Sequence, residues 1–132
     1  MSQPDFVLTT VLPASPARLY EAWVDPEQHA AMTGAGATSD PREGGDFTAW
    51  DGYIEGRYRA LVPGRHIAMR WRTSDFPAGA PDAVVEVLFE EDAAGTRLTL
   101  TQRSSPPDQA QAYVQGWEDY YFAPMRAWLA GG

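Results

Sequence analysis

The last quarter of the chain limits the fold more than any other stretch. Its large apolar side chains recur at spacings of four and three residues: Tyr113, Trp117, Tyr121, Met125 and Trp128. Side chains at these spacings lie along one face of a helix. This face carries too much aromatic surface to remain in water, so it must pack against a large concave partner. The sequence therefore predicts a long C-terminal helix with an apolar underside, capped by residues 105–108 (SPPD).

The chain before this helix reads as a first strand, two short helices and a series of further strands. A β-rich run at 6–12 precedes Ser15-Pro16 and Asp25-Pro26, each a capping side chain followed by proline, which is typical of a helix start. The second helix is expected to end near Met32. Apolar runs separated by glycine and proline turns then predict strands at 35–40, 46–51, 53–62, 66–73, 83–90 and 96–103.

Alternation within these strands predicts a sheet that buries one face only. The apolar face would carry Ile67, Met69, Trp71, Val85, Val87, Phe89, Leu98, Leu100 and Gln102. Strands joined by short turns pair antiparallel. The fold class expected is α+β, a curved antiparallel sheet of about six to seven strands around the C-terminal helix, in one domain over residues 1–132. Four arginines are expected on the outer, convex face: Arg57, Arg59, Arg70 and Arg72.

Charge and composition exclude several functions. The formal net charge of −8 repels nucleic acid and anionic membranes, and we expect neither as a partner. There is no cysteine, no apolar run of bilayer length and no basic leader, so a cytoplasmic location is expected. The two histidines, His29 and His66, lack metal-site spacing and are both expected at the surface. No metal, no cofactor and no catalytic set are predicted.

Several short strings occur in the order found in a known family. They are residues 19–27 (LYEAWVDPE), 40–47 (DPREGGDF), Gly56 with 63–65 (PGR), 95–98 (GTRL) and Gly116-Trp117. In these strings the chain resembles bacterial homologues of the activator of the ninety-kilodalton heat-shock protein ATPase, within the START-like (SRPBCC) superfamily. It departs from them at Trp23-Val24, where Leu-Thr is frequent, and at Met32, where tryptophan is common.

The resemblance implies a helix-grip (Bet v-type) fold and binding of a small apolar or amphipathic molecule. The guest would lie between the helix and the sheet, where we expect it to contact Tyr58, Trp71, Val87, Phe89, Leu100, Tyr113, Trp117 and Tyr121. The alternative is that these side chains fill the space and form a plain core. Gly116, inside the helix, is open to both interpretations: close approach by a guest or close packing under Trp117. Pro124 is expected to kink or break the helix.

Two other classes of function remain open at this stage. One is an enzyme of the cyclase or aromatase kind acting on an aromatic or polyketide-like substrate, with Tyr58, Tyr121 or Asp51 as the proton-transfer group. The other is an interaction module, either a homodimer formed through strand edges or a stress-related, chaperone-linked partner. A non-enzymatic binding protein is favoured because the apolar stripe is strong and no catalytic residues converge.

Overall fold

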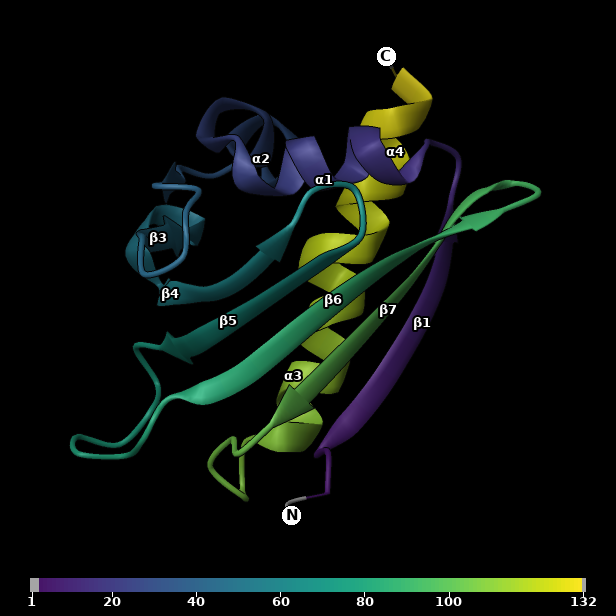
Figure 1. The fold of residues 1–132 in the computed structure, drawn as a ribbon. Helices are drawn as coiled ribbons and strands as arrows, with labels where there is room; N and C mark the ends of the chain where they lie inside the picture. The colour runs from purple at the N-terminus through teal and green to yellow at the C-terminus, as the bar shows by residue number, and fades with distance from the viewer. Residues whose placement is uncertain (1–2, 132) are drawn as a thin grey trace.

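A seven-stranded antiparallel sheet forms one layer of the molecule, and the C-terminal helix crosses its inner face (Figure 1). The computed structural model describes residues 3–131. The strands lie in the order β1-β7-β6-β5-β4-β3-β2. Their bounds are β1 Phe6–Leu12, β2 Thr38–Ser39, β3 Asp46–Ala49, β4 Ile54–Val62, β5 His66–Thr73, β6 Ala83–Asp92 and β7 Gly95–Arg103. This architecture confirms the predicted α+β helix-grip fold.

Two short helices follow β1 and cover one end of the sheet (Figure 1). Helix α1 (Pro16–Val24) is capped by the Ser15 hydroxyl, which accepts from the Arg18 amide. Helix α2 (Pro26–Thr33) is capped by the Asp25 carboxylate and ends at Gly34, whose φ of 86° only glycine adopts readily. Both helices begin where the serine-proline and aspartate-proline pairs predict.

The inner face of the sheet is apolar, as alternation predicts. Leu98, Leu100 and Gln102 of β7 are fully buried, and they pair with β6 residues Phe89, Val87 and Val85. Ile67, Met69 and Trp71 of β5 continue the same face. Nine inward side chains of this size remove enough apolar surface from water to dominate folding.

The C-terminal helix is continuous in its path but changes its winding in the middle. It comprises α3 (Ala110–Trp117), a π-helical segment η2 (Glu118–Phe122) and α4 (Ala123–Gly131). Within η2 the backbone bond spans five residues, from the Ala123 amide to the Glu118 carbonyl. Pro124 follows directly and has no amide hydrogen to donate to the carbonyl four residues back. The helix therefore does not break at Pro124. It widens into the π-helical segment just before the proline and then continues as α4.

Three local expectations are wrong. The helix does not start at residues 105–108: Gln109 precedes α3 without a side-chain cap, and Ser105 instead accepts a hydrogen bond from Gln102. The strand expected at 46–51 ends at Ala49, because residues 50–52 form a 3₁₀ turn, η1. The strand expected at 35–40 shrinks to the two residues of β2.

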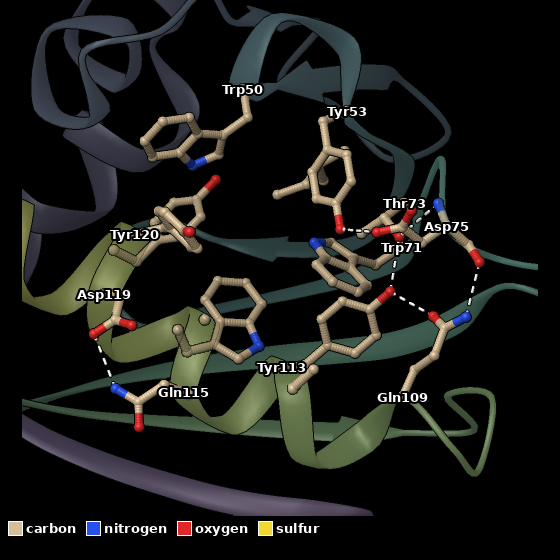
Figure 2. A pocket seen from close by; sticks show the side chains of 15 residues that line it. Trp50, Tyr53, Trp71, Thr73, Asp75, Gln109, Tyr113, Gln115, Asp119 and Tyr120 are labelled. Atoms are coloured by element: carbon tan, nitrogen blue, oxygen red, sulfur yellow. Dashed lines mark hydrogen bonds between the residues drawn. The ribbon is translucent and has the colours of Figure 1, made fainter.

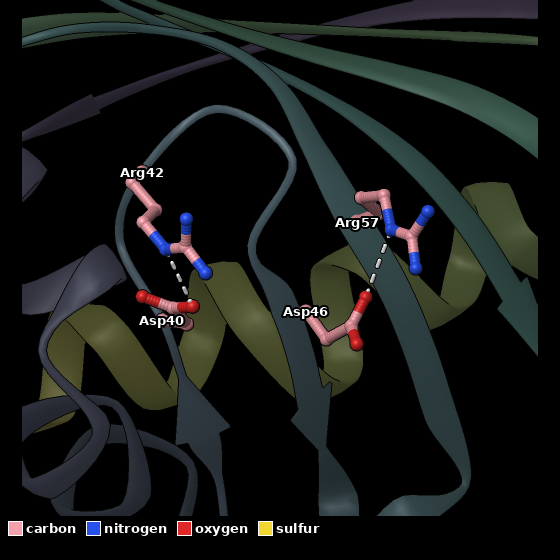
Figure 3. Close-up of polar contacts among 4 residues, drawn as sticks. All are labelled: Asp40, Arg42, Asp46 and Arg57. Atoms are coloured by element: carbon pink, nitrogen blue, oxygen red, sulfur yellow. Dashed lines mark hydrogen bonds and ion pairs between the residues drawn. The ribbon is translucent and has the colours of Figure 1, made fainter.

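Two arginines near the β2 edge of the sheet form exposed ion pairs, Arg57 on β4 and Arg42 in the loop after β2. Arg57 lies 2.9 Å from Asp46, and Arg42 lies 2.8 Å from Asp40 (Figure 3). All four side chains are about half exposed or more. Solvent screens pairs of this kind, so each contributes at most about 1 kcal/mol to folding. Asp46 is therefore a solvated strand end. No helix within residues 3–131 has the length and apolar character to cross a membrane.

Candidate functional site

A pocket of about 960 Å³ lies between the first half of the C-terminal helix and the β3–β5 end of the sheet (Figure 2). Seven of its fifteen lining residues are aromatic. The aromatic residues are Trp50, Tyr53, Trp71, Tyr113, Trp117, Tyr120 and Tyr121. The remaining lining residues are Ile54, Thr73, Asp75, Gln109, Ala112, Gln115, Gly116 and Asp119.

The inner wall is a stack of aromatic rings contributed by three elements. Trp117 lies 4.9 Å from Tyr121 and 5.6 Å from Trp71, measured between ring centroids. Behind them Trp23 of α1 stacks on Tyr121 at 5.2 Å. Each such pair adds about 1 kcal/mol beyond the area that it buries. These ring contacts join α1, β5 and the C-terminal helix behind the pocket.

His29 lies behind this wall, although the sequence predicts it at the surface. Its Nδ1 lies 2.9 Å from the Trp23 carbonyl and its Nε2 lies 2.9 Å from the Tyr121 hydroxyl. A carbonyl can only accept, so Nδ1 carries the hydrogen and the Tyr121 hydroxyl donates to Nε2. Burial lowers the pKa of His29, and burial raises the pKa of Tyr121. The pair is neutral and serves to hold Tyr121 in place.

A chain of hydrogen bonds closes one end of the pocket (Figure 2). The Tyr113 hydroxyl donates to Gln109 Oε1 and accepts from Thr73 Oγ1, each over 2.7 Å. The Gln109 amide donates to the Asp75 carbonyl over 2.7 Å, and the Tyr53 hydroxyl donates to the Asp75 carboxylate over 2.6 Å. Desolvation and this last bond raise the pKa of Tyr53 to about 12. The start of α3 is thereby tied to the loop after β5.

The opposite rim is formed by a turn with unusual backbone geometry. Trp50, Asp51 and Gly52 all have positive φ, at 53°, 57° and 91°, a region that costs side-chain-bearing residues about 1 kcal/mol or more. Asp51 holds the turn: its carboxylate accepts from the Gly36 amide over 2.7 Å, and its own amide donates to the Gly36 carbonyl. The turn places the Trp50 ring 5.4 Å from that of Tyr120.

Trp50 also carries the one buried polar side-chain atom that has no hydrogen-bond partner among residues 3–131, its indole Nε1. A buried donor without an acceptor costs about 1–3 kcal/mol. Neither Trp50 nor the turn that holds it is recognisable as a site from the sequence, because positive φ at a tryptophan has no residue signature. Tyr53, Asp75 and Gln109 are missed for the same kind of reason: they meet only in three dimensions.

The structure divides the predicted lining residues into three groups. Trp71, Tyr113, Trp117 and Tyr121 line the pocket. Tyr58 lines a separate void of about 10 Å³, no larger than one water molecule, and burial raises its pKa to about 12. Val87, Phe89 and Leu100 are buried among core residues and line neither space. This corrects the predicted lining: they belong to the hydrophobic core, where Phe89 meets Tyr20 of α1 edge to face at 6.1 Å.

Of the proton-transfer candidates, only Tyr121 reaches the pocket. Asp51 is exposed and bonded to Gly36, and Tyr58 bonds Ser39 Oγ over 2.7 Å. Gly116 lines the pocket, and a Cβ added there would lie 3.8 Å from Tyr120, an ordinary contact. Close packing therefore does not require this glycine. Within residues 3–131 no three His, Cys, Asp or Glu side chains gather as they would around a metal ion.

The chain is similar in sequence and in structure to several known proteins. The human activator of 90 kDa heat shock protein ATPase homolog 1 is 35% identical over 112 residues, which cover 85% of this chain and 33% of the human protein. The chain thus spans about a third of the length of that relative. An HSP90 activator from Plasmodium falciparum superposes with a TM-score of 0.85 at 21% identity, over 95% of each chain.

A protein of Chromobacterium violaceum is 30% identical and has a TM-score of 0.69, over 92% of this chain and 94% of that one. Residues 13–130 match the family described as Activator of Hsp90 ATPase homolog 1-like protein. That match takes in both short helices, all strands after β1 and nearly the whole C-terminal helix. The chain therefore belongs to the family of Activator of Hsp90 ATPase homolog 1-like proteins.

Proposed function

We propose that this protein binds a small apolar or amphipathic molecule in the aromatic pocket. The observation that supports this most directly is the pocket itself, about 960 Å³ with seven aromatic lining residues. That volume lies within the range of small-molecule sites. The lining combines these rings with polar groups of Thr73, Asp75 and Gln109, which favours a guest that has both apolar and polar parts.

Gly116 offers a way to test the proposal without disturbing the core. Methionine at this position would extend into the pocket from the helix, with space for its Cβ. We expect Gly116→Met to abolish binding of the neutral fluorescent probe N-phenyl-1-naphthylamine. Ala127→Met is the matched control, because Ala127 is exposed on α4 and does not line this pocket.

Equal probe binding by Gly116→Met, Ala127→Met and the unmodified protein would overturn the proposal. Native mass spectrometry of the purified protein, followed by analysis of any molecule released on denaturation, would identify a natural guest. A stoichiometric adduct lost in Gly116→Met supports the pocket as its site. An adduct retained in Gly116→Met places the guest elsewhere and contradicts the proposal.

A second candidate is a chaperone-linked interaction module. It is favoured by the 35% identity to the human activator of 90 kDa heat shock protein ATPase homolog 1. Since the chain spans about a third of that protein, this role needs its own test: the ATPase rate of a purified 90 kDa heat shock protein with and without the chain. A rate increase that Gly116→Met leaves intact would show a function independent of the pocket.

A further inference from the structure

The pocket carries charge of one sign only. Two of its lining residues, Asp75 and Asp119, are acidic. Within residues 3–131, no lining residue of the pocket is basic. Some acidic side chains elsewhere pair with arginine, such as Asp40 with Arg42, Asp46 with Arg57, and Asp82 with Arg72. Within residues 3–131, neither Asp75 nor Asp119 takes part in such an ion pair. The pocket therefore presents uncompensated negative charge.

Both carboxylates also keep free acceptor capacity. Asp75 accepts from the Tyr53 hydroxyl and Asp119 accepts from Gln115 Nε2 over 2.9 Å. An ionised carboxylate has room for about four hydrogen bonds. The other polar groups beside Asp75 are used by one another, since Thr73, Tyr113 and Gln109 form a closed chain. A guest at this end would meet the Asp75 carboxylate and the faces of aromatic rings.

Three of those rings come together at Asp75. Figure 2 shows Tyr53, Trp71 and Tyr113 converging beside its carboxylate. Trp71 and Tyr113 meet edge to face at 5.2 Å, so their planes stand nearly perpendicular, at 89°. An ammonium group is attracted both to a carboxylate and to the negative faces of aromatic rings, and this end of the pocket offers both.

Building on the proposed function, we propose that the guest is an organic cation with an apolar body. Its protonated or quaternary amine would lie beside Asp75 within the cage formed by Tyr53, Trp71 and Tyr113. Its body would lie along Trp117 toward Trp50 and Tyr120. The net charge of −8 favours the encounter with a cation and disfavours carboxylate or phosphate head groups.

Three probes with a common body test this: 3-phenylpropyltrimethylammonium, 4-phenylbutan-1-ol and 4-phenylbutyrate. We expect the cation to bind at least tenfold more tightly than the alcohol, and the anion most weakly of all. Binding is read by calorimetry or by the fluorescence of the pocket tryptophans. Asp75→Asn should weaken the cation about tenfold and leave the alcohol unchanged. Glu90→Gln removes one negative charge from an exposed site outside the pocket and should change neither.

A second variant, Tyr53→Leu, tests the aromatic rings separately from the Asp75 carboxylate. Tyr53 is 38% exposed, so the protein should fold, and the cage loses one ring while Asp75 stays. Weaker cation binding with unchanged alcohol binding supports the cage. Alcohol binding as tight as the cation, or equal effects of Asp75→Asn and Glu90→Gln, overturns the cation preference and leaves the pocket proposal standing. Failure of all three probes and of N-phenyl-1-naphthylamine overturns both.

Discussion

The indole N–H of Trp117 donates to Oε1 of Gln102 over 2.8 Å, and both side chains are buried. The Gln102 amide donates onward to Ser105 Oγ over 2.7 Å. A polar residue thus interrupts the apolar face of β7 at the one place where a buried indole needs an acceptor. The bond sets the orientation of the ring that forms the inner wall of the pocket.

Replacing Gln102 with methionine should therefore destabilise the protein by about 1–3 kcal/mol, because the indole N–H stays buried and loses its acceptor. Urea unfolding gives the free energy of unfolding. Gln111→Met, at an exposed position of α3, is the control and should stay within about 0.5 kcal/mol. If the two variants lose equal stability, the bond to Trp117 contributes nothing.

The buried His29 makes stability depend on pH. Burial lowers its pKa below 6.5, although the bond to the Trp23 carbonyl opposes that shift. The unfolded chain therefore takes up a proton at a higher pH than the folded one. The part of the free energy of unfolding that depends on a neutral His29 is fully present above about pH 6.5. It is lost as the pH falls below that value, by at most about 1.4 kcal/mol per pH unit.

Urea unfolding between pH 5.5 and 7.5 measures this slope. His29→Gln removes the titrating group and should flatten the profile in that interval, at some cost in stability at neutral pH. A profile of the same steepness in His29→Gln would assign the pH dependence to other groups.

Tyr121→Phe should cost about 1–2 kcal/mol, because His29 Nε2 loses its donor inside the protein. A double-mutant cycle with His29→Gln isolates the pair: residues in direct contact show coupling of about 0.5 kcal/mol or more. Additive losses in the cycle would mean that the hydroxyl and the imidazole do not stabilise one another. Unfolding free energies of the four proteins complete the measurement.

Replacing glycine with alanine should change stability in opposite directions at two positions, Gly56 and Gly116. A Cβ at Gly56 would lie 2.0 Å from the Arg70 carbonyl oxygen and 2.6 Å from the Phe47 ring, so Gly56→Ala should destabilise by roughly 2 kcal/mol or more. At Gly116 the nearest atom is 3.8 Å away, and alanine should stabilise the helix by up to about 1 kcal/mol. Thermal and urea unfolding compare the two. A destabilised Gly116→Ala would show that the helix needs glycine there.

Much of the fold could be predicted because its signals are local. The apolar stripe of the last helix, the caps at Ser15 and Asp25, and the alternation in β5–β7 each depend on neighbouring residues. His29 was predicted wrongly because its own helix is polar around it. Its partner Tyr121 lies 92 residues away, and no spacing rule connects them.

The residues of the candidate site also fall into two groups: those that a local sequence pattern predicts and those that it does not. Three helix residues of the pocket, Tyr113, Trp117 and Tyr121, belong to the stripe. Trp50, Tyr53 and Asp75 instead lie in turns, where no regular spacing indicates the direction of a side chain. Val87, Phe89 and Leu100 share a sheet face with Trp71, and alternation assigns a face but not a position along the helix that covers it.

The π-helical segment explains how one helix serves two partners. An α-helix turns about 100° per residue, so side chains spaced strictly by four drift about 40° at each step. The wider turn at residues 118–122 rotates the chain less per residue and offsets part of that drift. Trp117, Tyr121 and Met125 consequently stay buried in sequence. The C-terminal helix thus lines the pocket with residues up to Tyr121 and packs on α2 with residues of the π-helical segment and α4, so a single helix forms both the pocket wall and the attachment of the short helices.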